Sequence, residues 1–150
     1  MAYKANTKNR EKTDFIAIHC SATGPKQDFG AADIDKWHRA KGWKCIGYHY
    51  VIRRNGTVEE GREETTIGAH VENWNSVSVG VCMVGGVDAN DHTKAVNNFT
   101  PEQFASLKQL LVDLKIRYPK AVIQGHRDFP KVAKACPCFS VAEWLKTVGL

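Results

Sequence analysis

Hydrophobic residues recur along the chain in two patterns, short continuous runs and spacings of three and four. Runs of about four to eight residues rich in β-branched or aromatic side chains predict strands, and the wider spacing predicts amphipathic helices. The expected strands are residues 14–19, 48–52, 57–60, 77–84 and 121–124. The expected helices are residues 31–41, residues 100–118 and a terminal helix that follows Ser140. Strands and helices therefore alternate, which is typical of the α/β class.

Several expected elements carry turn or capping residues at their ends. Gln103 follows Thr100 by three positions, and Glu143 follows Ser140 by three positions, so each pair predicts a capping box at a helix start. Asn55-Gly56 lies between two expected strands. Because both central residues of a type I′ turn need a positive φ, this pair predicts a β-hairpin with a two-residue turn of that type.

A single α/β domain accounts for these elements, with a central mixed β-sheet of about five strands flanked by helices. Residues 1–13 are polar and rich in lysine, so we expect a loose N-terminal arm there and a domain over residues 14–150. No run of about eighteen apolar residues occurs, so no membrane insertion is expected. The N-terminus also lacks the apolar core of a signal peptide, which predicts that the chain stays in the cytoplasm where it is made.

The charge of the chain favours an anionic partner. The formal net charge is +5 at pH 7, and a positive protein attracts polyanions such as nucleic acid, anionic lipid or an acidic cell wall. The basic residues are scattered, however, and aromatic residues do not alternate with them in a way that suggests base stacking. We therefore expect no specific binding of nucleic acid, and we expect a monomer.

The five cysteines favour free thiols or metal ligands over a disulfide framework, because their number is odd and no secretory signal precedes them. Cys20, Cys45 and Cys82 are expected to be small buried hydrophobic residues. Cys136 and Cys138 stand close together in a loop with prolines, where a thiol is available to a metal.

Two expected strands end in histidines, which suggests a metal site that they share. His19 closes the first expected strand, and His126 lies just past the last one. If these strands are neighbours, both imidazoles meet one thiol, from Cys136 or Cys138, at the sheet edge where α/β proteins place their sites. Two histidines, one thiolate and a water form the ligand pattern of catalytic zinc. Binding of both thiols would instead make a closed structural site.

Six short motifs occur in the order and with the spacing of a known enzyme family. They are His19-Cys20-Ser21-Ala22-Thr23, Gly47-Tyr48-His49-Tyr50-Val51-Ile52, Asn55-Gly56-Thr57-Val58, Gly68-Ala69-His70, Gly125-His126 and Lys134-Ala135-Cys136-Pro137. In these motifs the chain resembles the type 2 N-acetylmuramoyl-L-alanine amidases, and most closely the short lysozyme-amidases (endolysins) of T-odd tailed phages. The resemblance covers the chain from about Asp14 to the C-terminus. It implies the type 2 amidase or peptidoglycan-recognition-like fold, a central sheet with flanking helices.

The resemblance implies one zinc ion per chain, held by His19, His126 and Cys136. The implied reaction is hydrolysis of the amide between the lactyl group of N-acetylmuramic acid and L-alanine, which frees the stem peptide of bacterial peptidoglycan from its glycan. Many relatives have Asp where Cys136 stands. A thiolate donates more charge than a carboxylate, so the zinc would be a softer Lewis acid here. Cys138 is left without a role.

Three further residues receive roles from the resemblance. Tyr48 matches the tyrosine near the metal-held water, where a phenol orients the water or relays its proton. Lys134 matches the residue that stabilises the tetrahedral intermediate, since an ammonium group donates strongly to an oxyanion in a partly dry cleft. His70 is expected to bind substrate in the cleft. Trp74, in an irregular segment, is a candidate for stacking on a sugar ring.

The remaining histidines have structural interpretations. His49 alternates with Tyr48 and Tyr50 along an expected strand, so it should point to the face opposite both and be packed rather than bind metal. His38, on the first expected helix, and His92, in a polar loop, are expected to be solvated.

Three alternatives to the amidase stay open. Proteins of this fold also bind peptidoglycan without cleaving it, but such a module would not need Cys136 and Tyr48, and both are present. Phage relatives also bind the phage RNA polymerase, which makes that enzyme a candidate partner. A cysteine hydrolase would leave His19 and Lys134 without roles. An endolysin of this kind would accumulate in the host cytoplasm and reach the wall only after a membrane lesion.

Overall fold

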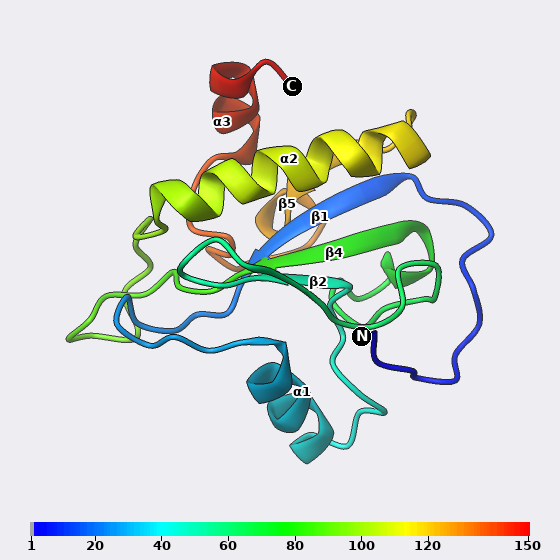
Figure 1. The fold of residues 1–150 in the computed structure, drawn as a ribbon, viewed down its shortest axis with the longest axis horizontal. Coiled ribbons are helices and arrows are strands. Elements are labelled where there is room, and N and C mark those ends of the chain that lie inside the picture. The colour runs from blue at the N-terminus through cyan, green and yellow to red at the C-terminus, as the bar shows by residue number, and fades with distance from the viewer. Residues whose placement is uncertain (1) are drawn as a thin grey trace.

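The computed structural model describes residues 2–150 and shows one five-stranded sheet with helices on both sides (Figure 1). The strands are β1 (Phe15–Cys20), β2 (Tyr50–Ile52), β3 (Val58–Glu60), β4 (Ser78–Met83) and β5 (Val122–Gly125). The helices are α1 (Ala31–Ala40), α2 (Pro101–Arg117) and α3 (Val141–Val148), with short 3-10 turns η1 (Asn75–Val77) and η2 (His126–Asp128). The predicted α/β class and its elements are confirmed.

The strand order is β3-β2-β4-β1-β5, so β1 lies between β4 and β5. β1 pairs in parallel with both of these neighbours, and β2 also pairs in parallel with β4. β3 alone runs antiparallel to its neighbour, β2, which makes the sheet mixed, as predicted. Because β1, β4 and β5 are parallel, their carboxyl ends meet at one edge of the sheet.

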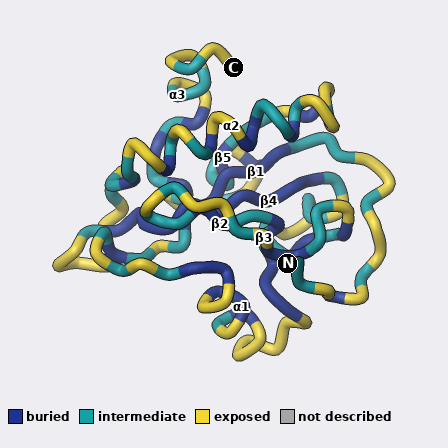
Figure 2. Tube along the Cα trace, in the orientation of Figure 1, coloured by how far each residue is buried: buried dark blue, intermediate teal, exposed yellow. Residues whose placement is uncertain are grey.

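The two faces of the sheet carry different side chains, since successive residues of a strand point to opposite sides. The main hydrophobic core joins one face to α2 and includes Ile16, Ile18, Val79, Val81, Met83, Leu107, Leu111 and Leu114. The opposite face packs against α1 in a smaller cluster that includes Ala31, Ile34, Val51 and Cys82. Figure 1 shows α2 and α1 on opposite sides of the sheet, and Figure 2 shows that β4 is buried along its length.

Both predicted helix starts are observed. The backbone N–H of Gln103 donates to Thr100 Oγ1 at 3.1 Å, and the backbone N–H of Thr100 donates back to Gln103 Oε1 at 2.9 Å. This reciprocal pair satisfies two backbone donors at the start of α2. At α3 the N–H of Glu143 donates to Ser140 Oγ at 3.3 Å, but among the described residues the return bond from Ser140 to Glu143 is absent, so only half of the predicted capping box forms.

The β2–β3 hairpin is confirmed, but the prediction of a type I′ turn is wrong. Asn55 keeps a negative φ, and only Gly56 is left-handed, with a φ of 89°. The N–H of Gly56 donates to the carbonyl of Arg53, and the N–H of Arg53 donates to the carbonyl of Thr57. These bonds describe a type I turn followed by a glycine bulge, a three-residue connection that needs one positive φ instead of two.

The N-terminal arm is ordered against the rest of the molecule, so the expectation that it is loose is wrong. The N–H of Tyr3 donates to the carbonyl of Gly61, and the N–H of Arg10 donates to the carbonyl of Thr65, each at 2.8 Å. Ala5 is buried, with 2% of its surface exposed. Backbone pairing and apolar burial together hold this polar segment in place, which its composition did not reveal.

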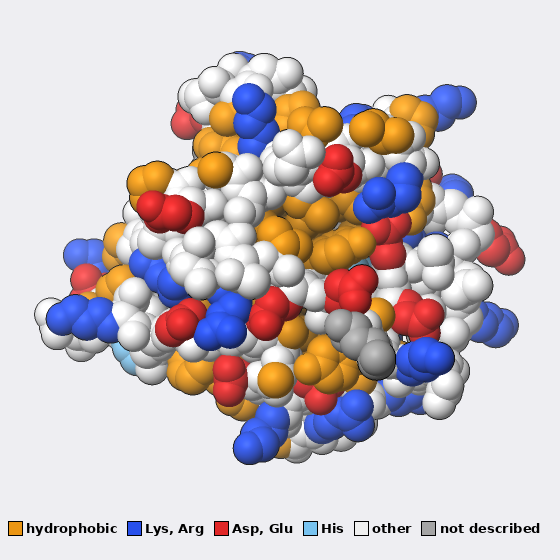
Figure 3. Space-filling view, viewed as in Figure 1, with side chains coloured by type: hydrophobic (Ala, Val, Ile, Leu, Met, Phe, Trp, Pro, Cys, Tyr) orange, Lys and Arg blue, Asp and Glu red, His pale blue; other side chains and the backbone are white. Residues whose placement is uncertain are grey.

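The surface agrees with the scattered charge of the sequence. On the face shown in Figure 3, lysine and arginine side chains are interspersed with aspartate and glutamate side chains. Within residues 2–150, no helix combines the length and the apolar character needed to cross a membrane.

Candidate active site

The pairing of β1 with β5 places two histidines side by side. The register aligns Ile18 with Gly125, so the next residues, His19 and His126, leave the two parallel strands at the same level. Their ring centroids are 4.6 Å apart. His19 is buried, whereas His126 is half-buried at the start of η2. The condition for a shared metal site, that these two strands are neighbours, is therefore met.

The loop after η2 returns to the same edge and brings a thiol with it. The N–H of Arg127 donates to the carbonyl of Cys136 at 2.9 Å, and the N–H of Cys20 donates to Cys136 Sγ at 3.1 Å. The first bond closes the loop, and the second attaches its thiol to the end of β1. Cys136 thus lies next to the strand that carries His19.

His19, His126 and Cys136 each offer one ligand atom, and these atoms lie within 4.8 Å of one another. Two imidazoles and one thiol suit zinc, because nitrogen and sulfur are its preferred donors and three protein ligands leave a fourth position open. Burial, followed by the charges of His126 and Lys134, holds the pKa of His19 well below its ordinary value. Burial also lowers the pKa of His126. Both rings are therefore neutral at neutral pH, the form that binds a metal.

Tyr48 lies against the candidate metal site. Its ring centroid is 5.1 Å from that of His19. Burial, followed by the nearby Cys82 thiol, raises the pKa of Tyr48 well above its ordinary value. The phenol therefore keeps its proton at neutral pH and serves as a hydrogen-bond donor. It precedes the first regular residue of β2, so its position depends on the loop that enters the strand.

A cleft of about 530 Å³ opens beside the histidines. Its lining is Trp43, Ala69, His70, Glu72, Asn73, Asn75, His126, Pro130, Lys131, Val132, Ala133 and Lys134. Lys134 is exposed, so its ammonium group is available to a bound molecule, and its charge contributes to the lowered pKa of His126. The Lys134 ammonium group therefore lies in the cleft close enough for its charge to act on His19 and His126.

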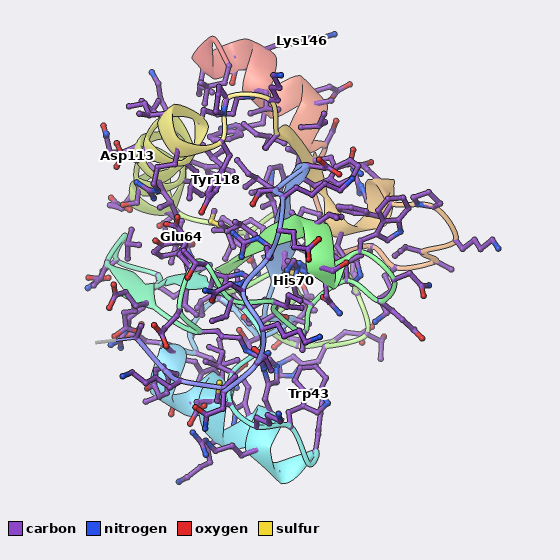
Figure 4. The ribbon with its side chains drawn as sticks, turned by 90° about the vertical axis from the view of Figure 1, so that its right-hand side faces the viewer. Trp43, Glu64, His70, Asp113, Tyr118 and Lys146 are labelled. Atoms are coloured by element: carbon purple, nitrogen blue, oxygen red, sulfur yellow. The ribbon has the colours of Figure 1, made fainter. Side chains whose placement is uncertain are left out.

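His70 lies on the cleft wall and also contacts a candidate ligand. Its Nδ1 is 2.9 Å from His19 Nε2, within hydrogen-bond distance. Asn75 Oδ1 accepts hydrogen bonds from the backbone N–H groups of His70 and Val71 at 2.7 and 2.8 Å. Asn75 was missed from the sequence because a single Asn in an irregular segment carries no signal of its own. Figure 4 shows His70 near the sheet and Trp43 on the connection that follows α1.

Gly80 on β4 makes room for the His70 ring. A Cβ atom at this position would lie 2.7 Å from the ring, closer than real contacts allow. The glycine in this strand therefore permits the close approach of a side chain to the sheet.

Trp74, proposed for sugar stacking, instead packs between Phe15 and Phe129, with ring centroids 5.4 and 5.9 Å away.

His49 is packed, as predicted, but the reason given for it is wrong. The N–H of Gly80 donates to His49 Nδ1 at 3.0 Å, and Nε2 lies 2.8 Å from the carbonyl of Thr66. Tyr50 packs with the main core, whereas Tyr48 packs with the cluster on the α1 side. The two tyrosines therefore do not share a face, because the regular alternation begins only at Tyr50.

The prediction for His38 is also wrong, while His92 is exposed as expected. His38 is 7% exposed, and its Nδ1 accepts a hydrogen bond from the N–H of Gly47 at 2.9 Å. Its ring packs 4.4 Å from that of Trp43. A histidine on a short helix looks solvated in sequence, but the loop after α1 folds back over it.

Cys20, Cys45 and Cys82 are buried, as predicted. Cys138 does not join the candidate metal ligands among the described residues, and its sulfur lies 3.8 Å from Cys20 Sγ. A side-chain hydrogen bond with Cys136, together with burial, raises the pKa of Cys20 to about 12. A hydrogen bond with Cys20, again with burial, raises the pKa of Cys138. Both thiols therefore stay protonated at neutral pH.

Known proteins share both the sequence and the fold. The family described as N-acetylmuramoyl-L-alanine amidase matches residues 9–139. The chain is 48% identical to the endolysin of Enterobacteria phage K11 over 98% of its own length and 94% of that protein. It is 47% identical to the endolysin of Escherichia phage T7, over 91% and 88% of the two chains.

Solved structures of lower identity show the same fold. N-acetylmuramoyl-L-alanine amidase LysC from Clostridium intestinale aligns with a TM-score of 0.77 at 24% identity, covering 100% of this chain and 98% of that one. Drosophila PGRP-LB aligns with a TM-score of 0.75 at 19% identity, covering 98% and 94%. The chain therefore belongs to the N-acetylmuramoyl-L-alanine amidase family.

Proposed function

We propose that this chain is a phage endolysin that hydrolyses the amide between N-acetylmuramic acid and L-alanine, with zinc held by His19, His126 and Cys136. Family membership and the endolysin relatives support the reaction. The observation that carries the metal assignment is the convergence of three ligand atoms within 4.8 Å at the sheet edge. When bound there, zinc would lower the pKa of a water toward about 7 and polarise the amide carbonyl.

The protein's own groups divide the remaining work. Tyr48, protonated and adjacent to His19, would orient the attacking water. Lys134 lies in the cleft, where its ammonium group would stabilise negative charge as the carbonyl carbon becomes tetrahedral. His70 would contact the substrate from the cleft wall while its Nδ1 holds the His19 ring. A module that only binds peptidoglycan would not need Tyr48, Lys134 and His70 to lie together beside the candidate metal site.

Zinc removal tests this mechanism directly. We expect the purified protein to release stem peptides from peptidoglycan, to lose this activity on treatment with a chelator, and to regain it when zinc is added. Metal analysis of the same samples should show one zinc per active chain. Full activity in samples shown to be free of zinc would refute the metal mechanism.

The two thiols of the loop provide a matched pair of variants. Cys136→Ser should lose both zinc and activity, because a hydroxyl is a poor zinc ligand. Cys138→Ser should keep both, because its sulfur is directed to Cys20. Equal losses in the two variants would indicate a closed structural site with both thiols bound.

Two consequences of the endolysin assignment need separate tests. We propose that the chain is made in the host cytoplasm and reaches the wall through a membrane lesion, which cell fractionation before and after lysis would examine. Binding to the phage RNA polymerase stays a prediction. A pull-down with the cognate polymerase would test it, and absence of retention would count against it.

A further inference from the structure

Two thiols beside the candidate zinc site have no part in the proposed reaction. Cys20 Sγ and Cys138 Sγ lie 3.8 Å apart, although the residues are 118 positions apart in the chain. At that separation the two sulfurs are close to van der Waals contact. Cys20 is buried at the end of β1, whereas Cys138 is half-buried and so remains open to small molecules.

Gly86 brings the two sulfurs over the same piece of backbone. A Cβ atom at Gly86 would lie 2.9 Å from Cys20 Sγ and 3.5 Å from Cys138 Sγ. Any side chain at this position would therefore collide with the first sulfur and touch the second. The bare backbone of Gly86 is what allows both thiols to occupy one small space.

We propose that Cys20 and Cys138 form an oxidation site that closes to a disulfide, with a small disulfide such as glutathione disulfide as the oxidant. The small fraction of Cys138 that is ionised attacks one sulfur of the oxidant, which releases one glutathione thiol and leaves a mixed disulfide on Cys138. Cys20 then loses its proton and attacks Cys138 Sγ, which forms the protein disulfide and releases the second glutathione thiol. Two electrons pass to the oxidant, and the two protons leave on the two glutathione molecules.

The movement that this bond requires is small. A disulfide has an S–S distance of about 2.05 Å, so the sulfurs must approach by about 1.8 Å. Side-chain rotation at the half-buried Cys138 and a small shift of its loop would have to supply this movement. Cys45 and Cys82, the other two thiols outside the candidate ligand set, are fully buried and do not share this access.

The disulfide would link the two segments that carry zinc ligands. Cys20 follows His19 directly, and its N–H already donates to Cys136 Sγ. Cys138 stands two residues after Cys136. The covalent bond would hold the Cys136 loop on the end of β1, so the oxidised protein should unfold at a higher temperature and release zinc more slowly.

The setting of this oxidation rests on the proposed function. An endolysin is made in a reducing cytoplasm and acts outside it, where disulfides persist. The thiols would therefore stay reduced during accumulation and close after the protein leaves the cell interior. The site would make the enzyme more durable at its place of action.

The test uses the zinc-loaded, full-length protein treated with glutathione disulfide. We expect mass spectrometry to show the loss of two hydrogens and a peptide that joins Cys20 to Cys138. The melting temperature should rise on the order of 10 °C, because the cross-link closes a long loop of the unfolded chain. Transfer of zinc to a chelator should slow about tenfold, the range over which contacts outside the ligand shell change metal affinity.

Matched variants separate this bond from other thiol chemistry. Cys138→Ser should show none of these changes on oxidation, with Cys138→Ala as a second variant, whereas Cys45→Ser should show all of them. An unchanged count of free thiols in the wild type, or a cross-link that contains Cys136, would overturn the proposal. Because mass and melting temperature are measured without substrate, an inactive protein would refute the proposed function and leave this result readable.

Discussion

The two faces of the central sheet use the same strands for different purposes. On β1, Ile16 and Ile18 pack under α2, whereas His19, the residue after Ile18, turns to the other side and meets His126. On β4, Val81 joins the α2 core, whereas Gly80 lies beneath the His70 ring. One face is filled with branched apolar side chains, and the other adds histidines and small residues to a smaller apolar cluster.

This difference reflects how each face is stabilised. Apolar side chains under α2 gain free energy from burial alone, in proportion to the area removed from water. The histidines opposite are buried polar groups, which need hydrogen-bond partners. His49 is paired with Gly80 and Thr66, and His70 with His19. Substitutions under α2 should therefore change stability, and substitutions on the cleft side should change activity.

Removal of a candidate zinc ligand should have the largest effect. His126→Ala leaves two ligands, so zinc should be lost and hydrolysis should fall by at least about 10³-fold, because no other group supplies hydroxide at neutral pH. Assays on purified peptidoglycan with metal analysis measure both quantities. Circular dichroism should show an unchanged fold. Retained activity in a variant without zinc would contradict the assignment of the reaction to the zinc ligands on the cleft face.

Removal of a buried side chain under α2 should have a large effect on stability and little effect on activity. Leu111 is fully buried in the main core. Leu111→Ala should lower the free energy of unfolding by about 2–5 kcal/mol, through lost burial and the cavity that remains. Urea denaturation measures this loss. The folded fraction should hydrolyse peptidoglycan at the wild-type rate, and a large fall in its rate would show that the two faces are coupled.

The cleft lysines sharpen the comparison within the site. Lys134→Met should reduce kcat about 10²-fold, because a preorganised donor to the developing oxyanion is lost. Lys131, which also lines the cleft, provides the matched variant. Lys131→Met should change kcat far less, and equal reductions in steady-state assays would show that general positive charge, and not one positioned group, serves the reaction.

A smaller effect should appear in the pH dependence of stability. Burial, more than the nearby charges, lowers the pKa of His38 to about 4. The unfolded chain therefore binds a proton below about pH 6.5 that the folded protein does not take up until about pH 4. Within this window, the free energy of unfolding should decrease as pH falls, by up to about 1.4 kcal/mol per pH unit for this residue.

The variant His38→Asn tests the assignment, because Asn Oδ1 can accept the Gly47 N–H that His38 Nδ1 now accepts. Urea denaturation between pH 7 and pH 5 should show a weaker pH dependence in the variant than in the wild type. The same dependence in both proteins would place the titrating group elsewhere.

Local patterns predicted much of this molecule because they depend on neighbouring residues alone. The apolar runs identified the strands, and Thr100 with Gln103 identified the start of α2. The motifs at His19 and His126 identified the family that the comparisons then showed. Errors occurred where packing outside the local pattern decides the environment. The N-terminal arm pairs with Gly61 and Thr65, more than fifty positions away, and His38 is covered by the loop that follows its own helix.

By itself, the sequence determined the class of the fold, the order of its elements and the residue types available for zinc chemistry. Only the tertiary structure decided which of these residues meet. The register of β1 on β5 places His19 beside His126. The loop after η2 brings the Cys136 thiol to the candidate zinc site and the Cys138 thiol to Cys20. Periodicity reports which face a side chain takes, but proximity between residues more than a hundred positions apart arises only from packing.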